Sequence, residues 1–256
     1  MLVTGASRGL GRILAVELAA RGARVSLVAR DKAALDEVAA EVGGTAFACD
    51  LTALDEVSTL VERVEAEAGP VDVVINNAAT FWLGPLERLT AAQLSATIAV
   101  NLVAPAEIIR TVLPGMRQRS RGHIVNVASL GGIMAIPDLA AYGASKAGLA
   151  HLTEILRTEL RGAPVGVTLI QVAAIEGTDM YVDGMKSPMI DRMVRRMGRL
   201  GLAMSEPAER VAVKIVDAVE QGRTSTVVPP VATVFHLMRR SPIAVASLVD
   251  THRRGR

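Results

Sequence analysis

Short apolar runs alternate with longer segments of helical periodicity along most of this chain. A run of four to eight apolar residues is typical of a buried strand, and parallel strands need a long crossover connection, usually a helix. The alternation therefore predicts an α/β fold: a doubly wound parallel sheet of seven strands with helices on both faces. Strands are expected at 2–3, 23–29, 45–49, 71–75, 122–127, 165–172 and 224–228, and helices at about 13–21, 32–42, 54–68, 94–103, 105–119, 141–161 and 207–221.

The chain has 256 residues, half of them apolar and only 2% aromatic, so an aliphatic core is expected. We expect a single domain over 1–230 and a C-terminal extension over 231–256. The single cysteine, Cys49, rules out an internal disulfide and favours a reducing compartment. The first residues lack the features of a signal peptide, and no uninterrupted apolar stretch marks a membrane span. A cytoplasmic protein is therefore predicted.

Charge is distributed unevenly along the chain. The segment from Lys186 to the end contains 13 of the 28 basic residues but only 6 of the 26 acidic ones. A solvated surface is the ordinary explanation for such a region. A nucleic-acid-binding protein would combine a compact basic patch with a reader motif or stacking aromatics, and the sequence has neither. We predict no nucleic-acid partner and no metal site.

A glycine-rich turn follows the first predicted strand and opens the first helix. Glycines let the backbone approach a pyrophosphate, and the N–H groups and dipole of the helix N-terminus stabilise its charge. The segment 4–11, TGASRGLG, has this position, although its spacing differs from G-x-G-x-x-G. It makes the predicted fold Rossmann-like. The residues predicted to bind a dinucleotide here are Gly5, Ser7, Arg8, Gly9, Leu10 and Gly11.

The end of the second strand distinguishes NAD from NADP. An acid there would bind the ribose 2′-hydroxyl, whereas an arginine nearby accommodates a 2′-phosphate. Here Ala29 and Arg30 occupy these positions, and Arg8 lies in the glycine turn. Two guanidiniums can hold a phosphate dianion, while Asp31 is expected to cap the next helix. NADP is the predicted cofactor, with NAD as the alternative.

Tyr142 and Lys146 stand four residues apart and share one face of the predicted helix 141–161. A nearby ammonium favours the phenolate and lowers the phenol pKa from about 10 toward neutral pH, which makes a usable general acid/base. Ser129, at the end of a strand, can hold a substrate oxygen while Tyr142 exchanges a proton with it. Such a Tyr–Lys pair alone also occurs on ordinary packed helices, so the assignment depends on the rest of the chain.

With these residues in order, the chain resembles the one-domain short-chain dehydrogenases/reductases over about residues 1–230. The landmarks that carry the resemblance are Thr4-Gly5, Gly9, Gly11, Asp50, Asn76-Asn77-Ala78, Asn101, Ser129, Tyr142 and Lys146. The resemblance implies that Tyr142 is the acid/base and that Ser129 orients the carbonyl or alcohol. Lys146 would bind the nicotinamide ribose and lower the Tyr142 pKa. Asn101 would hold a water that passes protons to Lys146.

The resemblance also implies further cofactor contacts and an assembly. The additional contact residues are Asp50, Leu51, Asn77, Ala78, Tyr142, Lys146 and Thr178. Asp50 has two readings from the residues themselves, because it can accept a hydrogen bond from an adenine amino group or cap helix 54–68, where Thr52 competes. The family commonly forms homodimers and homotetramers through its two long helices, here about 104–119 and 141–161.

The chain departs from the family pattern at two places. The family turn N-N-A-G ends here in Ala79, and the Pro-Gly that usually follows the sixth strand is replaced by Ala173-Ala174. The second segment normally faces the nicotinamide. Losing a rigid proline and a permissive glycine bears on that contact and not on the four catalytic candidates.

The predicted function is NADP-dependent interconversion of a ketone or aldehyde and an alcohol. The alternative is a non-catalytic dinucleotide-binding regulatory protein, which Ala173-Ala174 supports and the intact set Asn101, Ser129, Tyr142 and Lys146 argues against. An epimerase or dehydratase of the extended type would need a larger C-terminal domain than the residues beyond Pro230 provide.

Six of the ten methionines fall between 180 and 204, and four of them recur every four residues: Met185, Met189, Met193 and Met197. That spacing puts these four on one helical face, and methionine suits adaptable apolar surfaces. With Tyr181 beside them, they predict a mobile lid at about 178–204 over a lipophilic substrate. Two other interpretations are a helix that only packs on the core, and peripheral membrane contact by a basic amphipathic helix aided by the tail 231–256.

Overall fold

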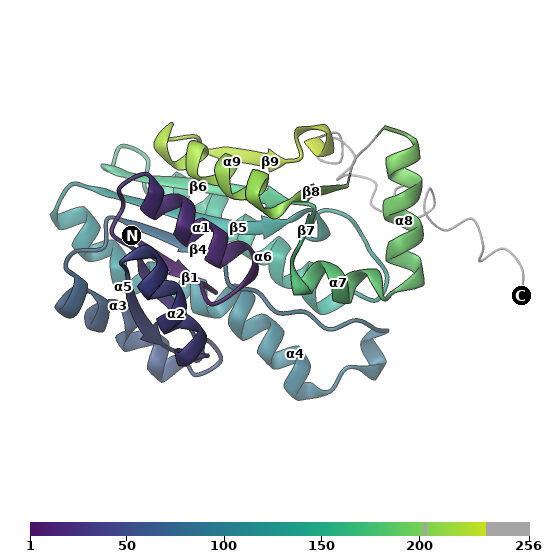
Figure 1. The fold of residues 1–256 in the computed structure, drawn as a ribbon, viewed down its shortest axis with the longest axis horizontal. Helices are drawn as coiled ribbons and strands as arrows, with labels where there is room; N and C mark the ends of the chain where they lie inside the picture. Colours follow the sequence, from purple (N-terminus) through teal and green to yellow (C-terminus); the bar gives the residue numbers. More distant parts are fainter. Residues whose placement is uncertain (202–203, 234–256) are drawn as a thin grey trace, which may run out of the picture.

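The computed structural model describes residues 1–201 and 204–233 (Figure 1). Its centre is a sheet of seven strands, all parallel, in the order β3-β2-β1-β4-β5-β6-β9. The doubly wound α/β sheet expected from the sequence is confirmed, and the strand order reverses between β1 and β4. The strands are β1 (Leu2–Thr4), β2 (Ser26–Ala29), β3 (Thr45–Ala48), β4 (Val73–Asn76), β5 (Gly122–Ser129), β6 (Val165–Val172) and β9 (Ser225–Val228).

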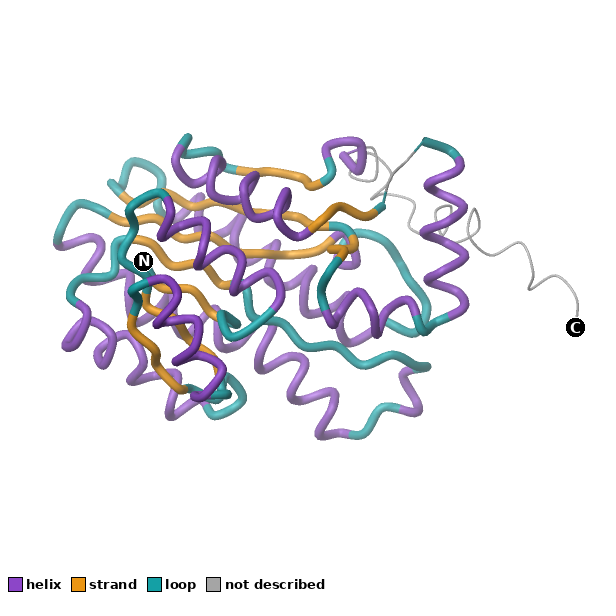
Figure 2. The backbone as a smooth tube through the Cα atoms, in the orientation of Figure 1, coloured by secondary structure: helices purple, strands orange, loops and turns teal. Residues whose placement is uncertain are grey.

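Helices cover both faces of this sheet (Figure 2). On one face pack α1 (Gly9–Ala20), α2 (Lys32–Val42) and α9 (Ala208–Glu220). On the other face pack α3 (Leu54–Ala68), α5 (Ala104–Gln118) and α6 (Ala140–Glu159). The central strands are buried on both faces, and this explains why they read as apolar runs in the sequence.

The two helices expected at 94–103 and 105–119 form one continuous helix over Ala91–Gln118. It consists of α4 (Ala91–Ile98), a π-helical turn over Ala99–Val103, and α5. By length and mean hydropathy (1.5) this helix could cross a bilayer, which the sequence analysis had not anticipated. However, Ile108, Val112 and Met116 of α5 pack into the core beneath the sheet.

The region after β6 differs from expectation. Ala174–Glu176 (β7) and Ser205–Pro207 (β8) pair as a second, two-stranded parallel sheet. Between them lie α7 (Asp179–Met185) and α8 (Pro188–Arg199). The prediction of one helical face from Met185 to Met197 is therefore wrong, because Ser187 caps a new helix whose first residue is Pro188.

Of the N-caps predicted for α2 and α3, only the one for α2 is confirmed. The Asp31 carboxylate accepts a hydrogen bond from the Ala34 N–H at the start of α2, as predicted. At α3 the N-cap is Ala53, and neither Asp50 nor Thr52 caps the helix. Instead Asp50 Oδ1 accepts hydrogen bonds from the Thr52 N–H and hydroxyl, both 2.9 Å long.

Candidate active site

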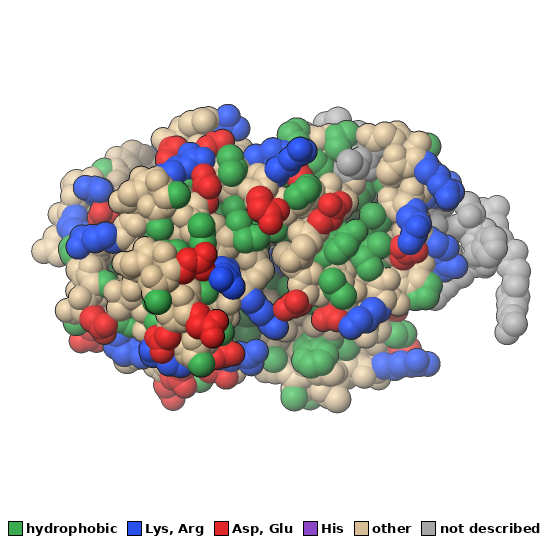
Figure 3. All heavy atoms as spheres, in the orientation of Figure 1, with side chains coloured by type: hydrophobic (Ala, Val, Ile, Leu, Met, Phe, Trp, Pro, Cys, Tyr) green, Lys and Arg blue, Asp and Glu red, His purple; other side chains and the backbone are tan. Residues whose placement is uncertain are grey.

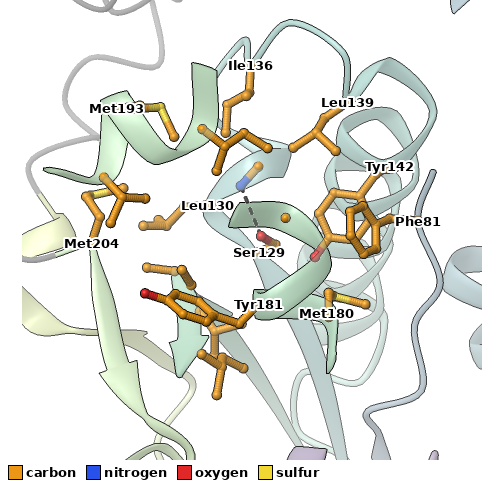
Figure 4. A pocket seen from close by; sticks show the side chains of 18 of the residues that line it. Phe81, Ser129, Leu130, Ile136, Leu139, Tyr142, Met180, Tyr181, Met193 and Met204 are labelled. Carbon is orange, nitrogen blue, oxygen red and sulfur yellow. Dashed lines mark hydrogen bonds between the residues drawn. The ribbon is translucent and has the colours of Figure 1, made fainter. Parts of the chain in front are cut away.

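Ser129 and Tyr142 lie side by side at the wall of an apolar cavity (Figure 4). Ser129 is the last residue of β5, and Tyr142 lies in the first turn of α6. Ser129 Oγ accepts a hydrogen bond of 3.1 Å from the Gly131 N–H, and the Tyr142 phenol lies close enough for the Ser129 hydroxyl to influence its pKa. Gly131 packs against both, since a Cβ there would lie 3.2 Å from Tyr142 Cε1. Burial raises the pKa of Tyr142, and the nearby Ser129 hydroxyl only partly opposes this shift.

Lys146 lies one helical turn beyond Tyr142, with 2% of its surface exposed. Its Nζ donates a hydrogen bond of 2.8 Å to the carbonyl oxygen of Val127 in β5. Burial lowers the pKa of Lys146 to about 8. The expectation that Lys146 lowers the Tyr142 pKa is not met here, because burial disfavours both charged forms and dominates both shifts.

Asn101 lies in the π-helical turn and is fully buried. Its Oδ1 accepts the Thr80 N–H at 2.8 Å, and its Nδ2 donates to the Thr80 carbonyl at 2.8 Å and to Ser145 Oγ at 3.0 Å. The Ser145 hydroxyl in turn donates to the Tyr142 carbonyl at 2.7 Å. The Asn101 amide thus links the loop after β4 to the start of α6, and the predicted water-holding role of Asn101 stays a prediction.

Phe81 belongs to this group, and the sequence analysis missed it. Its ring meets the Tyr142 ring edge to face, with centroids 6.0 Å apart and an interplanar angle of 68°. Phe81 follows Thr80, whose backbone Asn101 holds at both N–H and carbonyl. Its position a few residues beyond the carboxyl end of β4 was the available signal, since ligands bind at that edge of such sheets.

The glycine turn has the shape expected of a phosphate cradle. Gly5 and Gly9 have φ angles of 70° and 53°, which favour glycine. A Cβ on Gly11 would lie 2.0 Å from the Gly5 carbonyl oxygen, so no side chain fits there. The first N–H groups of α1, from Gly9 to Gly11, have no partner within the helix. Of the remaining predicted contacts in the turn, Ser7 is partly buried and Leu10 is buried.

Asn77 and Ala78 support this turn from β4. The Asn77 and Ala78 N–H groups each donate to Thr4 Oγ1 at 3.0 Å, and Asn77 Nδ2 donates to the Thr4 carbonyl at 2.9 Å. A Cβ on Gly5 would approach the Ala78 Cα to 2.9 Å. The Asn77 amide is therefore committed to holding the glycine turn.

The segment predicted to form a lid begins directly beside the glycine turn. Thr178 caps α7, and a Cβ on Gly9 would lie 3.6 Å from Thr178 Cγ2. Arg8 forms an ion pair of 3.0 Å with Asp179, and both side chains are largely exposed (76% and 68%). The predicted cofactor residue Thr178 thus lies beside the predicted phosphate cradle.

Arg8 and Arg30, the two arginines predicted to bind a 2′-phosphate, have different surroundings. Arg8 pairs with Asp179, whereas Arg30 is exposed near Asp50. The hydrogen bond from the Thr52 N–H lowers the pKa of Asp50, with a smaller contribution from the Arg30 charge. Leu51 is buried beside them.

Ala173 and Ala174 use backbone groups that the usual Pro-Gly would alter. The Ala173 N–H donates to the Val228 carbonyl at 2.8 Å, a bond that proline cannot make, and the Ala174 N–H donates to the Met204 carbonyl at 2.9 Å. Both alanines line the cavity. The two substitutions are thus consistent with an ordered wall.

The cavity has an empty volume of about 880 Å³, including its open mouth. Its walls are mainly aliphatic and aromatic, and the lid methionines that line it are Met180, Met185, Met193 and Met204. Met189 and Met197, which were predicted to share this face, do not line it, and Met197 packs against the neighbouring core cluster. Figure 4 shows Met193 and Met204 on one side of Ser129 and Phe81 with Tyr142 on the other.

The two faces of α8 differ in character. Ile190, Met193 and Val194 line the cavity. The opposite face carries the exposed side chains of Arg192, Arg195, Arg196 and Arg199, and Figure 3 shows basic side chains gathered over this helix. Because the apolar face lines the cavity, it is not free to lie on a membrane. Most of the predicted membrane-contacting tail lies outside the described residues.

Comparisons with known proteins agree with this geometry. A family model for short chain dehydrogenases matches residues 1–187. A ketoacyl reductase of Nostoc sp. is 34% identical over 233 residues, which cover 89% of this chain and 77% of that protein. A fatty acyl-CoA reductase of Mycobacterium tuberculosis is 35% identical over 217 residues, which cover 82% of this chain and 70% of that protein.

Solved structures give the same result. A metagenomic short-chain oxidoreductase in complex with NADP has a TM-score of 0.72 and 34% identity, covering 88% of this chain and 94% of that one. A short-chain dehydrogenase from Sphingobium yanoikuyae in complex with NADPH has a TM-score of 0.76 and 26% identity, covering 100% and 97%. The chain therefore belongs to the short-chain dehydrogenase/reductase family of NAD(P)-dependent oxidoreductases.

Proposed function

We propose that this protein is an NADP-dependent reductase that converts a ketone or aldehyde of a lipophilic substrate into an alcohol, and catalyses the reverse reaction. The observation that carries the proposal is the adjacent pair of Ser129 and Tyr142 at the wall of an apolar cavity. A hydroxyl and a phenol that meet at one point can bind a single carbonyl or alcohol oxygen together. A nicotinamide, when bound, supplies or accepts the hydride.

In this proposal Tyr142 transfers the proton. Burial raises its pKa, so the phenol is protonated at neutral pH and is ready to donate a proton to a carbonyl oxygen that is becoming an alcohol. Ser129 Oγ holds the same oxygen. The ammonium of Lys146, with a pKa of about 8, is predominantly charged at pH 7 and lies one turn away, where it stabilises a phenolate left by proton transfer.

Asn101 acts in the proposal as a positioning residue. By linking Thr80 to Ser145 it holds the loop that carries Phe81 against the helix turn that carries Tyr142. This role belongs to the amide side chain, and the predicted water relay from Asn101 to Lys146 stays a prediction.

Several features support NADP as the cofactor. The glycine cradle excludes Cβ atoms where a pyrophosphate would approach, and the position after β2 that would hold an acid in an NAD site is Ala29. Arg8 and Arg30 are exposed and lie at the glycine turn and after β2, respectively. The two similar solved structures described above contain NADP and NADPH.

The cavity supports a lipophilic substrate. A binding site for a small ligand is typically an apolar cleft with few polar groups, and the lining of this cavity fits that description. Two of the similar proteins are named for reactions on acyl chains, a ketoacyl reductase and a fatty acyl-CoA reductase.

The non-catalytic alternative rested on Ala173-Ala174. Because both residues make backbone hydrogen bonds and line the cavity, the change gives no reason to infer loss of turnover. The homodimer or homotetramer expected through α5 and α6, and the cytoplasmic location, stay predictions.

The proposal is tested by following NADPH absorbance with a panel of ketones and aldehydes, and NADP+ reduction with the matching alcohols. We expect turnover of aliphatic carbonyl compounds, with kcat/KM rising with chain length. Substrate-dependent oxidation of NADPH that is confined to small, charged or sugar-like carbonyls would contradict the lipophilic assignment. A lack of turnover across the panel, with NADPH binding intact by calorimetry, would contradict the enzymatic one.

A further inference from the structure

The phenol of Tyr142 lies toward one side of the cavity, and Ser129 lies nearer its middle (Figure 4). Tyr142 and Phe81 stand together on one side of Ser129, while Met193 and Met204 lie on the other side (Figure 4). The aliphatic far end is continuous with a buried cluster of Leu130, Met134, Met193, Met204 and Ala232. A carbonyl bound by Ser129 and Tyr142 therefore has a long apolar space on one side and the Phe81 ring on the other.

Phe81 is held firmly in this place. Its ring packs edge to face with Tyr142 at 6.0 Å, and the backbone of the preceding Thr80 is bonded twice to the buried Asn101 amide, each bond 2.8 Å long. The loop is also tied down further along by the bond from the Gly84 N–H to the Asp138 carbonyl, 3.1 Å long. The hydrogen bonds fix the backbone next to Phe81, and the edge-to-face contact with Tyr142 favours one orientation of the ring, so Phe81 forms a wall beside Tyr142.

On the basis of the proposed carbonyl chemistry, we propose that Phe81 is a specificity-determining residue that closes the reacting end of the cavity. It limits the smaller substituent of the carbonyl to a hydrogen or a methyl group. The larger, apolar substituent then lies along Leu130, Met193 and Met204. The inference names the substrate class more closely: long-chain aldehydes and methyl ketones, whose carbonyl stands at or next to the chain end.

Two isomeric ketones test this without a change in overall hydrophobicity. In 2-decanone the smaller substituent is a methyl group, and in 5-decanone it is a butyl group. We expect wild-type kcat/KM to favour 2-decanone by at least about tenfold, as is usual when extra methylenes meet a rigid wall. In Phe81→Ala the ratio should fall to about threefold or less, mainly through a gain on 5-decanone.

Two further variants serve as controls. Phe81→Leu shortens the wall while keeping an aliphatic side chain, and should give an intermediate ratio; it decides the question if Phe81→Ala fails to fold. Met193→Ala enlarges the far end, and should alter the dependence on chain length among methyl ketones without the gain on 5-decanone that is expected of Phe81→Ala.

The outcomes separate this inference from the proposed function. Turnover of both ketones by the wild type without preference, or a ratio unchanged in both Phe81 variants, overturns the role of Phe81 and leaves the carbonyl reductase intact. Turnover of neither ketone, nor of any aldehyde, overturns both.

Discussion

The region around the predicted catalytic residues, here called the reacting end, differs in construction from the region of Arg8 and Arg30, where a 2′-phosphate is expected to bind. Lys146 and Asn101 have exposed fractions of 2% and 0%, and each is hydrogen-bonded within the chain. Arg8 and Arg30 are exposed, and the partner that Arg8 does have, Asp179, is itself on the surface. An exposed ion pair contributes only about 0.2–1 kcal/mol, whereas an unsatisfied buried polar group costs about 1–3 kcal/mol.

This contrast indicates different kinds of mutational effect. Substitutions at the reacting end should change both stability and turnover, because buried groups there serve the fold and the chemistry together. Substitutions at the exposed arginines should leave folding unchanged and alter only the preference between two cofactors. The predictions below test this division in order of decreasing effect.

Lys146→Met should greatly reduce turnover, with a loss on the order of 10²–10⁴-fold in kcat. The same change should stabilise the fold at pH 7. Burial lowers the Lys146 pKa to about 8 from the ordinary 10.5, so the native state penalises the charged form. This destabilisation of the native state is at most about 3 kcal/mol, and the hydrogen bond to the Val127 carbonyl offsets part of it.

The pH dependence of this difference follows from linkage. Between pH 8 and 10.5 the unfolded chain holds more protons at Lys146 than the native one, so wild-type stability gains from this group as pH rises. Denaturant unfolding at pH 7 and pH 10 should therefore show the advantage of Lys146→Met shrinking. An advantage that stays constant or grows with pH would contradict the lowered pKa.

Asn101→Ala should reduce kcat by about ten- to a hundredfold and lower the free energy of unfolding by about 2–4 kcal/mol. It leaves the Thr80 N–H and carbonyl without their partner and frees the loop that places Phe81 against Tyr142. Gln93→Ala is the matched control, since it removes a capping-box partner from α4. The control should lower stability by about 1 kcal/mol with turnover unchanged. Equal kcat in Asn101→Ala and wild type would rule out the positioning role.

Arg30→Ala and Arg8→Ala should each weaken NADPH binding by roughly tenfold, with NADH binding and the unfolding free energy unchanged. Calorimetric titration at low and high salt measures this, and the loss should shrink as salt screens exposed charges. Arg12→Ala is the control, because Arg12 is exposed one turn along α1 and pairs with Glu41. Equal affinity of the wild type for NADPH and NADH would refute the assignment.

Much of the fold was predictable because it rests on local patterns. The bounds of α2, α3 and β6 match the expected ranges, and each of these elements shows clear periodicity or an uninterrupted apolar run. The strands β7 and β8 were missed because three-residue strands are defined by their tertiary pairing, here Ala174 with Ser205. The break before α8 was detectable, since Ser187-Pro188 is a typical helix start.

For the site, the sequence pattern predicted which residues come together, but not their hydrogen-bond partners or the direction of their pKa shifts. Ser129 and Tyr142 come together as predicted, and Thr178 lies against the glycine turn. The pKa of Tyr142 is raised by burial, and the Asn101 amide reaches Thr80 from a π-helical turn. No local sequence pattern reveals either feature. Phe81 was missed because its role depends on a contact with a residue 61 positions later in the chain.

The central claim is that Tyr142 transfers the proton, and Tyr142→Phe tests it most directly. The variant removes one hydroxyl and keeps the ring that packs on Phe81, so the fold and the cavity should be retained. We predict a loss of about 10²–10⁴-fold in kcat for the best ketone or aldehyde, with NADPH affinity by calorimetry within about threefold of wild type. Turnover within about twofold of wild type would contradict the account.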